Sequence, residues 1–210
     1  MSLASREREN LGALLLQLGP DAPTLLDGWT TRDLAAHLYV REHRLPWGLG
    51  NFFSPLAKRL GKEMDKARNR PYEDNIQDWL AGPSKFAAPL FAPLNTGENF
   101  VHHEDVRRAQ GTDVQPRELS AAAQERLLKS ATSYGKVTLR KAPVPVILTP
   151  EHLPPVTLGD KSGVSDQGDR VVRVFGDPSE LLLWVVGRAA VAKVRVDNEE
   201  LLEGYEMSVG

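Results

Sequence analysis

Residues 95–111 read Asn-Thr-Gly-Glu-Asn-Phe-Val-His-His-Glu-Asp-Val-Arg-Arg-Ala-Gln-Gly and bring acidic, imidazole and basic side chains close together. In a helix, Glu98 and His102 share one face, and Asp105 follows one turn later. Val101 and Val106 flank this line, so the polar groups interrupt the apolar stripe that a helix normally buries. Burying them costs free energy unless another group compensates them. A divalent metal ion would do so, and its ligands need about this spacing.

Two simpler interpretations of the same stretch need no metal. Asn95 and Glu98 have the spacing of a helix N-terminal cap, in which Glu98 would reach back to the backbone. Glu98 and His102 would also form an ordinary pair on a helix surface, worth only a few tenths of a kcal/mol. Two ligands are not a metal site, so the choice depends on a third ligand elsewhere in the chain.

Length and charge limit the class of protein. The 210 residues are enough for a buried core, in one domain or two small ones. The net charge of −2 and the absence of a long basic run argue against nucleic acid as the main partner. No apolar stretch has membrane-spanning length, and the first residues lack the apolar core of a signal peptide. We therefore expect a cytoplasmic protein with no membrane partner.

The sequence contains no cysteine. This excludes disulfides, thiolate metal ligands and a cysteine nucleophile. A zinc-like site would have to use histidine and carboxylate ligands, and any thiol chemistry would need a thiol from a small molecule.

Apolar spacing and cap residues predict a helical N-terminal domain over residues 1–133. Thr30 and Asp33 are placed to cap a helix that carries His37 beside a leucine stripe. Asp33 lies one turn before His37, where it could hold the second nitrogen of the imidazole. Three prolines in residues 82–93 predict a broken or kinked segment before the motif helix. The expected helices are 5–18, from Thr31 through Leu45, from Ser54 past Met64, 73–81, the motif helix to about Gly111, and 118–133.

After Tyr134-Gly135 the composition becomes rich in β-branched residues and proline, which predicts a small α+β domain over residues 134–210. Asp177-Pro178-Ser179-Glu180 has the pattern of a helix start, and the apolar helix 178–190 is expected to pack on a sheet. Expected strands lie within 137–147 and at 156–158, 170–175 and 191–196, and a short helix is expected at 198–205. The predicted fold class is therefore α+β.

Two blocks resemble the mycothiol-dependent maleylpyruvate isomerase family of the DinB/YfiT-like superfamily. They are Gly28-Trp-Thr-Thr-Arg-Asp-Leu-Ala-Ala-His37-Leu and Glu98-Asn-Phe-Val-His102-His-Glu-Asp-Val-Arg-Arg. The resemblance covers most of residues 5–133 and extends more weakly to Glu180-Leu-Leu-Leu-Trp-Val-Val-Gly-Arg188. It implies a DinB-like four-helix bundle that holds a divalent metal between helices, followed by a small α/β C-terminal domain.

The resemblance also implies roles for individual residues. The metal ligands would be His37, Glu98 and His102, with one position left for water or substrate. Asp105 would support a ligand, unless it pairs with Arg107 or Arg108. Arg188 would bind a carboxylate of the substrate as a catalytic residue. Alternatively, it would merely lie near the C-terminal end of its helix, where its positive charge interacts favourably with the helix dipole.

The expected function is that of a divalent-metal-dependent enzyme using a low-molecular-weight thiol such as mycothiol, as an isomerase or S-transferase. The implied partners are this thiol and a small organic substrate. Zinc is the expected metal and nickel is an alternative, because both suit His and Glu ligands. Two other functions stay open: a non-enzymatic ligand-binding bundle with a structural or vestigial metal site, and a metal-dependent hydrolase. The substrate and the oligomeric state, monomer or homodimer, are not specified by the sequence.

Overall fold

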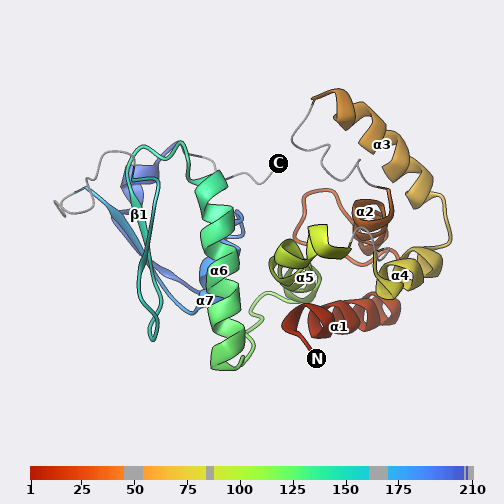
Figure 1. Ribbon diagram of the computed structural model, residues 1–210, viewed down its shortest axis with the longest axis horizontal. Coiled ribbons are helices and arrows are strands. Elements are labelled where there is room, and N and C mark those ends of the chain that lie inside the picture. Colours follow the sequence, from red (N-terminus) through yellow and green to blue (C-terminus); the bar gives the residue numbers. More distant parts are fainter. Residues whose placement is uncertain (45–53, 84–87, 161–169, 206, 208–210) are drawn as a thin grey trace. The chain divides into compact units, whose positions relative to one another are not determined.

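The structure, a computed structural model, describes residues 1–44, 54–83, 88–160, 170–205 and 207; for 54–59 and 88–93 it describes the backbone alone. The chain divides into two compact units, residues 1–114 and 115–209. Among the described residues the first unit holds five α-helices, and the second holds two more with a four-stranded sheet (Figure 1). This content agrees with the predicted α+β class. The division at residue 114 rather than 133 places the helix expected at 118–133 in the second unit.

The helices of the first unit begin and end at residues whose local chemistry explains them. The Thr30 backbone N–H donates to Asp33 Oδ2 at 2.9 Å, which confirms the predicted capping box of the second helix. Gly19, with φ of +77°, ends the first helix, and its N–H donates to the Leu15 carbonyl. Residue Leu45 of the expected second helix lies outside the described residues. The elements are α1 (Leu3–Leu18), α2 (Thr31–His43), α3 (Ser54–Arg68), α4 (Tyr72–Ala81) and α5 (Ala88–Ala109).

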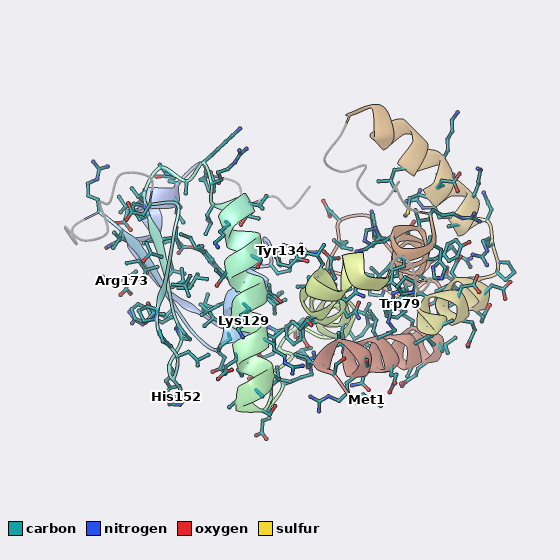
Figure 2. The ribbon with its side chains drawn as sticks, viewed as in Figure 1. Met1, Trp79, Lys129, Tyr134, His152 and Arg173 are labelled. Atoms are coloured by element: carbon teal, nitrogen blue, oxygen red, sulfur yellow. The ribbon has the colours of Figure 1, made fainter. Side chains whose placement is uncertain are left out.

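The core of this unit lies between α1, α2, α4 and α5. Trp79 of α4 (Figure 2) is fully buried there. The Arg8 guanidinium of α1 lies over its ring, 4.8 Å from the ring centre. A second, smaller cluster joins α2 to α3 around Tyr39 and Met64. The main cluster contains Leu11, Leu15, Leu34, Ala35, Leu38, Tyr72, Ile76, Trp79 and Val106. These helices therefore hold α2 and α5, which carry the motif residues, in a fixed arrangement.

Helix α5 is longer than the helix that the sequence predicted. It begins at Ala88 and continues through Pro93, so the segment that three prolines were expected to break is helical from residue 88 onward. Pro89 falls in the first turn, where a proline removes no intrahelical hydrogen bond. Because Asn95 is inside the helix, the interpretation of Asn95 and Glu98 as an N-terminal cap is wrong.

The sheet of the second unit has the order β2-β1-β3-β4, with β1 parallel to β3 and the other pairs antiparallel. Val172 and Val174 of β3 are buried on either side of the partly exposed Arg173, as alternation predicts, whereas Val146, Ile147 and Leu148 of β1 are all buried. The last strand is shorter than expected: residues 191–194 are not paired with a neighbouring strand, and the strand begins at Arg195. The elements are β1 (Val146–Thr149), β2 (Val156–Leu158), β3 (Val172–Phe175), β4 (Arg195–Asp197) and the terminal 3₁₀ turn η3 (Glu199–Leu202).

Helix α6 (Ala121–Thr138) runs past the point at which the sequence predicted a change to strands. Gly135 is inside this helix, and a Cβ there would lie 2.4 Å from Leu158 Cδ1 of β2. The glycine thus permits close packing of helix on sheet rather than ending the helix. Val137, expected in a strand, is helical and 59% exposed.

Helix α7 (Pro178–Val185) begins after Asp177, as predicted, but ends five residues before the expected Ala190. Gly187 has φ of +83°, its N–H donates to the Trp184 carbonyl, and the N–H of Arg188 donates to Leu183. These two bonds are the Schellman ending of a helix, which requires a left-handed residue. α6 and α7 pack side by side against the sheet (Figure 1), and the Gln124 amide oxygen accepts the Ser179 N–H at 3.0 Å. None of the described helices is both long and apolar enough to cross a membrane.

Candidate metal site

The structure brings the three predicted metal ligands together. His37 comes from α2, and Glu98 and His102 come from successive turns of α5. One candidate ligand atom from each side chain lies within 4.8 Å of those from the other two. His102 is buried, and His37 and Glu98 are partly buried. Two helices that are fixed by the surrounding core therefore present two imidazoles and one carboxylate to a common point.

The two nitrogens of His102 have different carboxylate neighbours. Nε2 lies 3.4 Å from Glu98 Oε2, and Nδ1 lies 3.1 Å from Asp105 Oδ2. Asp105 is completely buried. The two arginines that follow it on α5, Arg107 and Arg108, both contact the neighbouring acid Glu104. Burial by itself lowers the pKa of His102, but hydrogen bonds with Asp105 and Glu98 outweigh it and raise that pKa above the ordinary 6.5. Asp105 thus holds the ring with Nε2 directed at the common point.

His37 lies between two other rings. Its centre is 5.5 Å from that of Trp29 and 5.2 Å from that of His102, both in edge-on geometry. Burial lowers the pKa of His37 to about 3, with the charges of His102 and Arg41 acting in the same direction and Glu98 opposing them. His37 is therefore neutral at pH 7, which is the form that binds a metal ion.

The expectation that Asp33 would hold the second nitrogen of His37 is not met. Asp33 Oδ2 accepts from Thr30, and Oδ1 accepts from Arg68 Nε at 2.7 Å. The cap directs this carboxylate toward the start of the helix, and Arg68 holds its other oxygen there. The residue of the block 28–38 that does contact His37 is Trp29, through its ring.

The spacing of these groups suits a tetrahedral ion. Two ligands at about 2.0–2.1 Å from such an ion lie about 3.4 Å apart, which is the distance between His102 Nε2 and Glu98 Oε2. A set of two histidines and one glutamate occurs in catalytic zinc sites, with the fourth position left for water or substrate. The ligand atom of His37 lies within 4.8 Å of those of its two partners, so closing around an ion needs only a small movement of its side chain. The donor chemistry and the geometry both fit a divalent ion.

Arg41 is the nearby residue that the sequence interpretation missed. It lies one turn after His37 on α2, and its Nε is 3.6 Å from Glu98 Oε2. Its Nη1 donates to the Asn95 amide oxygen at 3.0 Å and lies 3.6 Å from Glu42 Oε1. The signal was present in the sequence, because positions 37 and 41 have the same four-residue spacing as 98 and 102. Recognising it would have required knowing that the two helices face each other.

Two other residues considered from the sequence lie elsewhere. His103 is directed to α1, where its Nδ1 is 2.8 Å from Glu7 Oε2, so leaving it out of the ligand set agrees with the structure. Arg188 lies in the second unit, in the turn after α7, and donates from Nη1 to the Val186 carbonyl at 2.7 Å. This contact fits the interpretation of Arg188 as a group at the C-terminal end of a helix.

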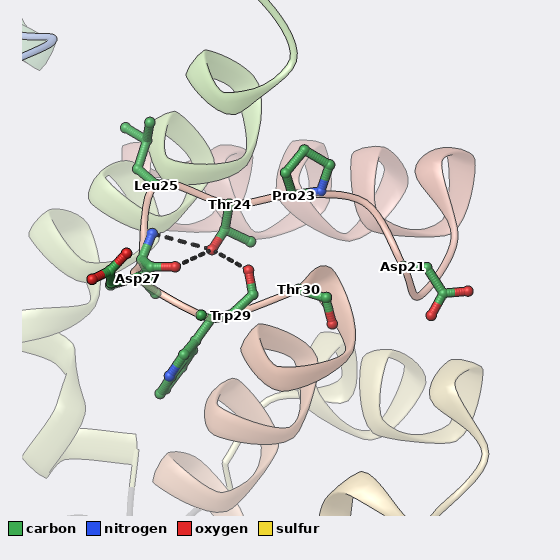
Figure 3. Close-up of a pocket in the computed structure, with 9 residues that line it drawn as sticks. Asp21, Pro23, Thr24, Leu25, Asp27, Trp29 and Thr30 are labelled. Atoms are coloured by element: carbon green, nitrogen blue, oxygen red, sulfur yellow. Dashed lines mark hydrogen bonds between the residues drawn. The ribbon is translucent and has the colours of Figure 1, made fainter.

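A shallow depression lies in the loop between α1 and α2. Residues 21 and 23–30 line it, with a volume of about 450 Å³, and Thr24 shapes it by donating to the Trp29 carbonyl at 3.0 Å (Figure 3). The Leu25 N–H donates to the Asp105 carbonyl, which ties this loop to α5. The depression thus adjoins the candidate site through Trp29, whose ring contacts His37.

Comparison of the chain with protein-family models, with curated proteins and with solved structures found no match. The family resemblance of the two sequence blocks therefore stays a prediction, and a function has to be inferred from the residues of the site.

Proposed function

We propose that the first unit is a DinB-like bundle that binds one divalent metal ion through His37, Glu98 and His102. We further propose that the protein is a metal-dependent enzyme using a low-molecular-weight thiol, of the isomerase or S-transferase type. The convergence of these three side chains from two helices is the observation that carries the proposal.

The chemistry of the site supports this assignment. A bound divalent ion would lower the pKa of a thiol or water molecule and so provide a nucleophile at neutral pH. His37 and His102 would hold the ion, Glu98 would neutralise part of its charge, and Asp105 would keep His102 in the correct tautomer. The chain itself has no cysteine, so a thiol substrate or cofactor has to come from a small molecule.

A second candidate is a ligand-binding bundle without a functional metal. The Arg41–Glu98 contact of 3.6 Å favours it, because a guanidinium and His102 together compensate the Glu98 carboxylate without a metal ion. The two candidates differ in one measurable respect. In the second, replacing Glu98 by Gln changes stability and leaves no metal-dependent property to lose.

Metal content of the purified protein tests the proposal. We would load wild type, His102→Ala and the control His152→Ala with zinc or nickel, remove loose ions, and measure bound metal by mass spectrometry. His152 is an exposed imidazole in the second unit, so its removal should leave about one equivalent of metal bound, as in wild type. His102→Ala should bind far less. No metal in wild type under any loading condition would overturn the proposal and leave the ligand-binding bundle.

Titration of the loaded protein with a small thiol then tests the enzymatic part. A change in the absorption spectrum of a cobalt-loaded site would indicate that the sulfur reaches the metal. Metal binding with no response to any thiol would favour a structural site or a hydrolase over thiol chemistry.

A further inference from the structure

We propose that Arg41 is a positioning residue that makes this site select an anionic fourth ligand, such as a thiolate, over a neutral one. This inference rests on the proposed metal site and concerns the charge that surrounds it. Arg41 stands where its charge acts on the metal and on that fourth ligand together, because its Nε lies 3.6 Å from Glu98 Oε2.

The charges around the site show why Arg41 matters. A divalent ion held by two neutral imidazoles and Glu98 has one remaining positive charge. Asp105, completely buried behind His102, cancels that charge. The guanidinium of Arg41 restores one positive charge, so an anion at the fourth position makes the whole cluster neutral. Without Arg41, the same cluster would be neutral before the fourth ligand arrives, so an anion would gain less electrostatic attraction on binding.

The surroundings of Arg41 keep its charge in place. Its Nη1 donates to Asn95 Oδ1, which is one turn before Glu98 on α5. Behind it, Glu42 is buried and accepts two hydrogen bonds from Arg8, at 2.8 and 2.5 Å. Arg8 and Glu42 cancel each other's charge. Of the three side chains Arg8, Glu42 and Arg41, it is therefore Arg41 that contributes a positive charge to the site. The Arg41 side chain is only 10% exposed, and solvent screens it weakly.

One charge should have opposite effects on the two binding steps. Arg41 repels the incoming metal ion, because it lies beside the oxygen that the metal needs. It attracts the anion that binds afterwards. A residue that merely holds the fold together would not act in opposite directions on a cation and an anion.

The test uses Co²⁺ as the metal and 2-mercaptoethanol as the thiol. We would measure Co²⁺ affinity by competition with a chelator, and thiolate affinity by the absorption band that sulfur ligation produces. The variants are wild type, Arg41→Gln and Arg41→Lys, each checked for folding by circular dichroism. Arg41→Gln should bind Co²⁺ more tightly and the thiolate more weakly, each on the order of tenfold. Arg41→Lys keeps the charge and should stay near wild type in both.

A second variant tests the same charge if Arg41→Gln fails to fold. Asn95→Ala removes the oxygen that accepts from Arg41 Nη1 and loosens the guanidinium beside Glu98, so it should shift both affinities in the same directions as Arg41→Gln, but by less. Weaker binding of both ligands in Arg41→Gln, or no change in either, would overturn the inference while the metal site stands. Failure of wild type to bind Co²⁺ would instead overturn the proposed function, and the inference would fall with it.

Discussion

His102 Nδ1 lies 3.1 Å from Asp105 Oδ2, within one turn of α5, while Nε2 of the same ring faces Glu98. The buried carboxylate fixes which nitrogen is available to a metal, and it makes that nitrogen more basic. We therefore expect Asp105→Asn to lower Co²⁺ affinity by about 10- to 100-fold with little change in fold. Titration of the apo protein measures this directly.

Glu104→Gln is the matched control for that substitution. Glu104 is an adjacent buried acid on the same helix, but its contacts are with Arg107 and Arg108. The Glu104→Gln substitution should lower the stability of the protein and leave the metal affinity of the folded protein unchanged. Equal losses of affinity in the two variants would show that Asp105 has no specific role.

Tyr72 gives a pH dependence that is independent of the metal site. Its hydroxyl donates to the Leu15 carbonyl at 2.9 Å, and burial raises the pKa of Tyr72 from 10.0 to about 12. The unfolded chain thus loses this proton at a lower pH than the folded protein. The resulting stabilisation is complete below pH 10.0 and is lost as the pH rises toward about 12.

Tyr72→Phe should accordingly lower the free energy of unfolding by about 1 kcal/mol at pH 7. It should also flatten the decline in stability above pH 10.0. Urea denaturation at neutral and alkaline pH measures both effects. A variant that declines as steeply as wild type would mean that other groups control alkaline unfolding.

Gly187 ends α7, and its backbone conformation leaves little room for a side chain. Its φ is +83°, and a Cβ would lie 2.8 Å from the Met207 carbonyl oxygen. Gly187→Ala therefore combines left-handed strain with a backbone clash and should cost about 2–3 kcal/mol. Gly204 has φ of +76° with nothing within 4 Å of a Cβ, so Gly204→Ala isolates the strain and should cost about 1 kcal/mol. Thermal denaturation compares the two, and equal losses would rule out the clash.

Local signals in the sequence predicted some elements well. The Thr30–Asp33 capping box and the Asp177-Pro178 start are readable because a cap involves residues only a few positions apart. The spacing of Glu98 and His102 placed both on one face of a helix in the same way. Adding His37 needed the family resemblance, since no local pattern indicates that α2 faces α5.

The errors arose where tertiary contacts override a local signal. Gly135 resembles a helix end, but it is buried inside α6 because Leu158 packs where a side chain would be. Gly187, by contrast, is a true helix end, and its positive φ and the two hydrogen bonds that close α7 there show the difference. Asp33 was assigned to His37 from spacing alone, whereas Arg68 of α3 and the helix cap engage both of its oxygens. Arg41 was missed because its partners Asn95 and Glu98 are on another helix.

Arg8 and Glu42 form the buried ion pair that joins α1 to α2. Both nitrogens of the Arg8 fork bond the Glu42 carboxylate, at 2.8 and 2.5 Å, and the guanidinium also donates to the Trp79 carbonyl of α4. Arg8→Met keeps the apolar stem but leaves the Glu42 carboxylate buried with less compensation, so it should cost about 3–5 kcal/mol. Arg6→Met, on an exposed position of the same helix, should change stability by about 0.5 kcal/mol or less.

The double variant with Glu42→Met separates the pair from its surroundings. If the pair acts as a unit, the double variant should cost less than the two single variants together, with a coupling of at least about 1 kcal/mol. Urea denaturation of the four proteins gives this coupling. Strictly additive losses would show that Arg8 stabilises the protein independently of Glu42, through the ring contact and the hydrogen bond with Trp79 that Glu42→Met leaves intact.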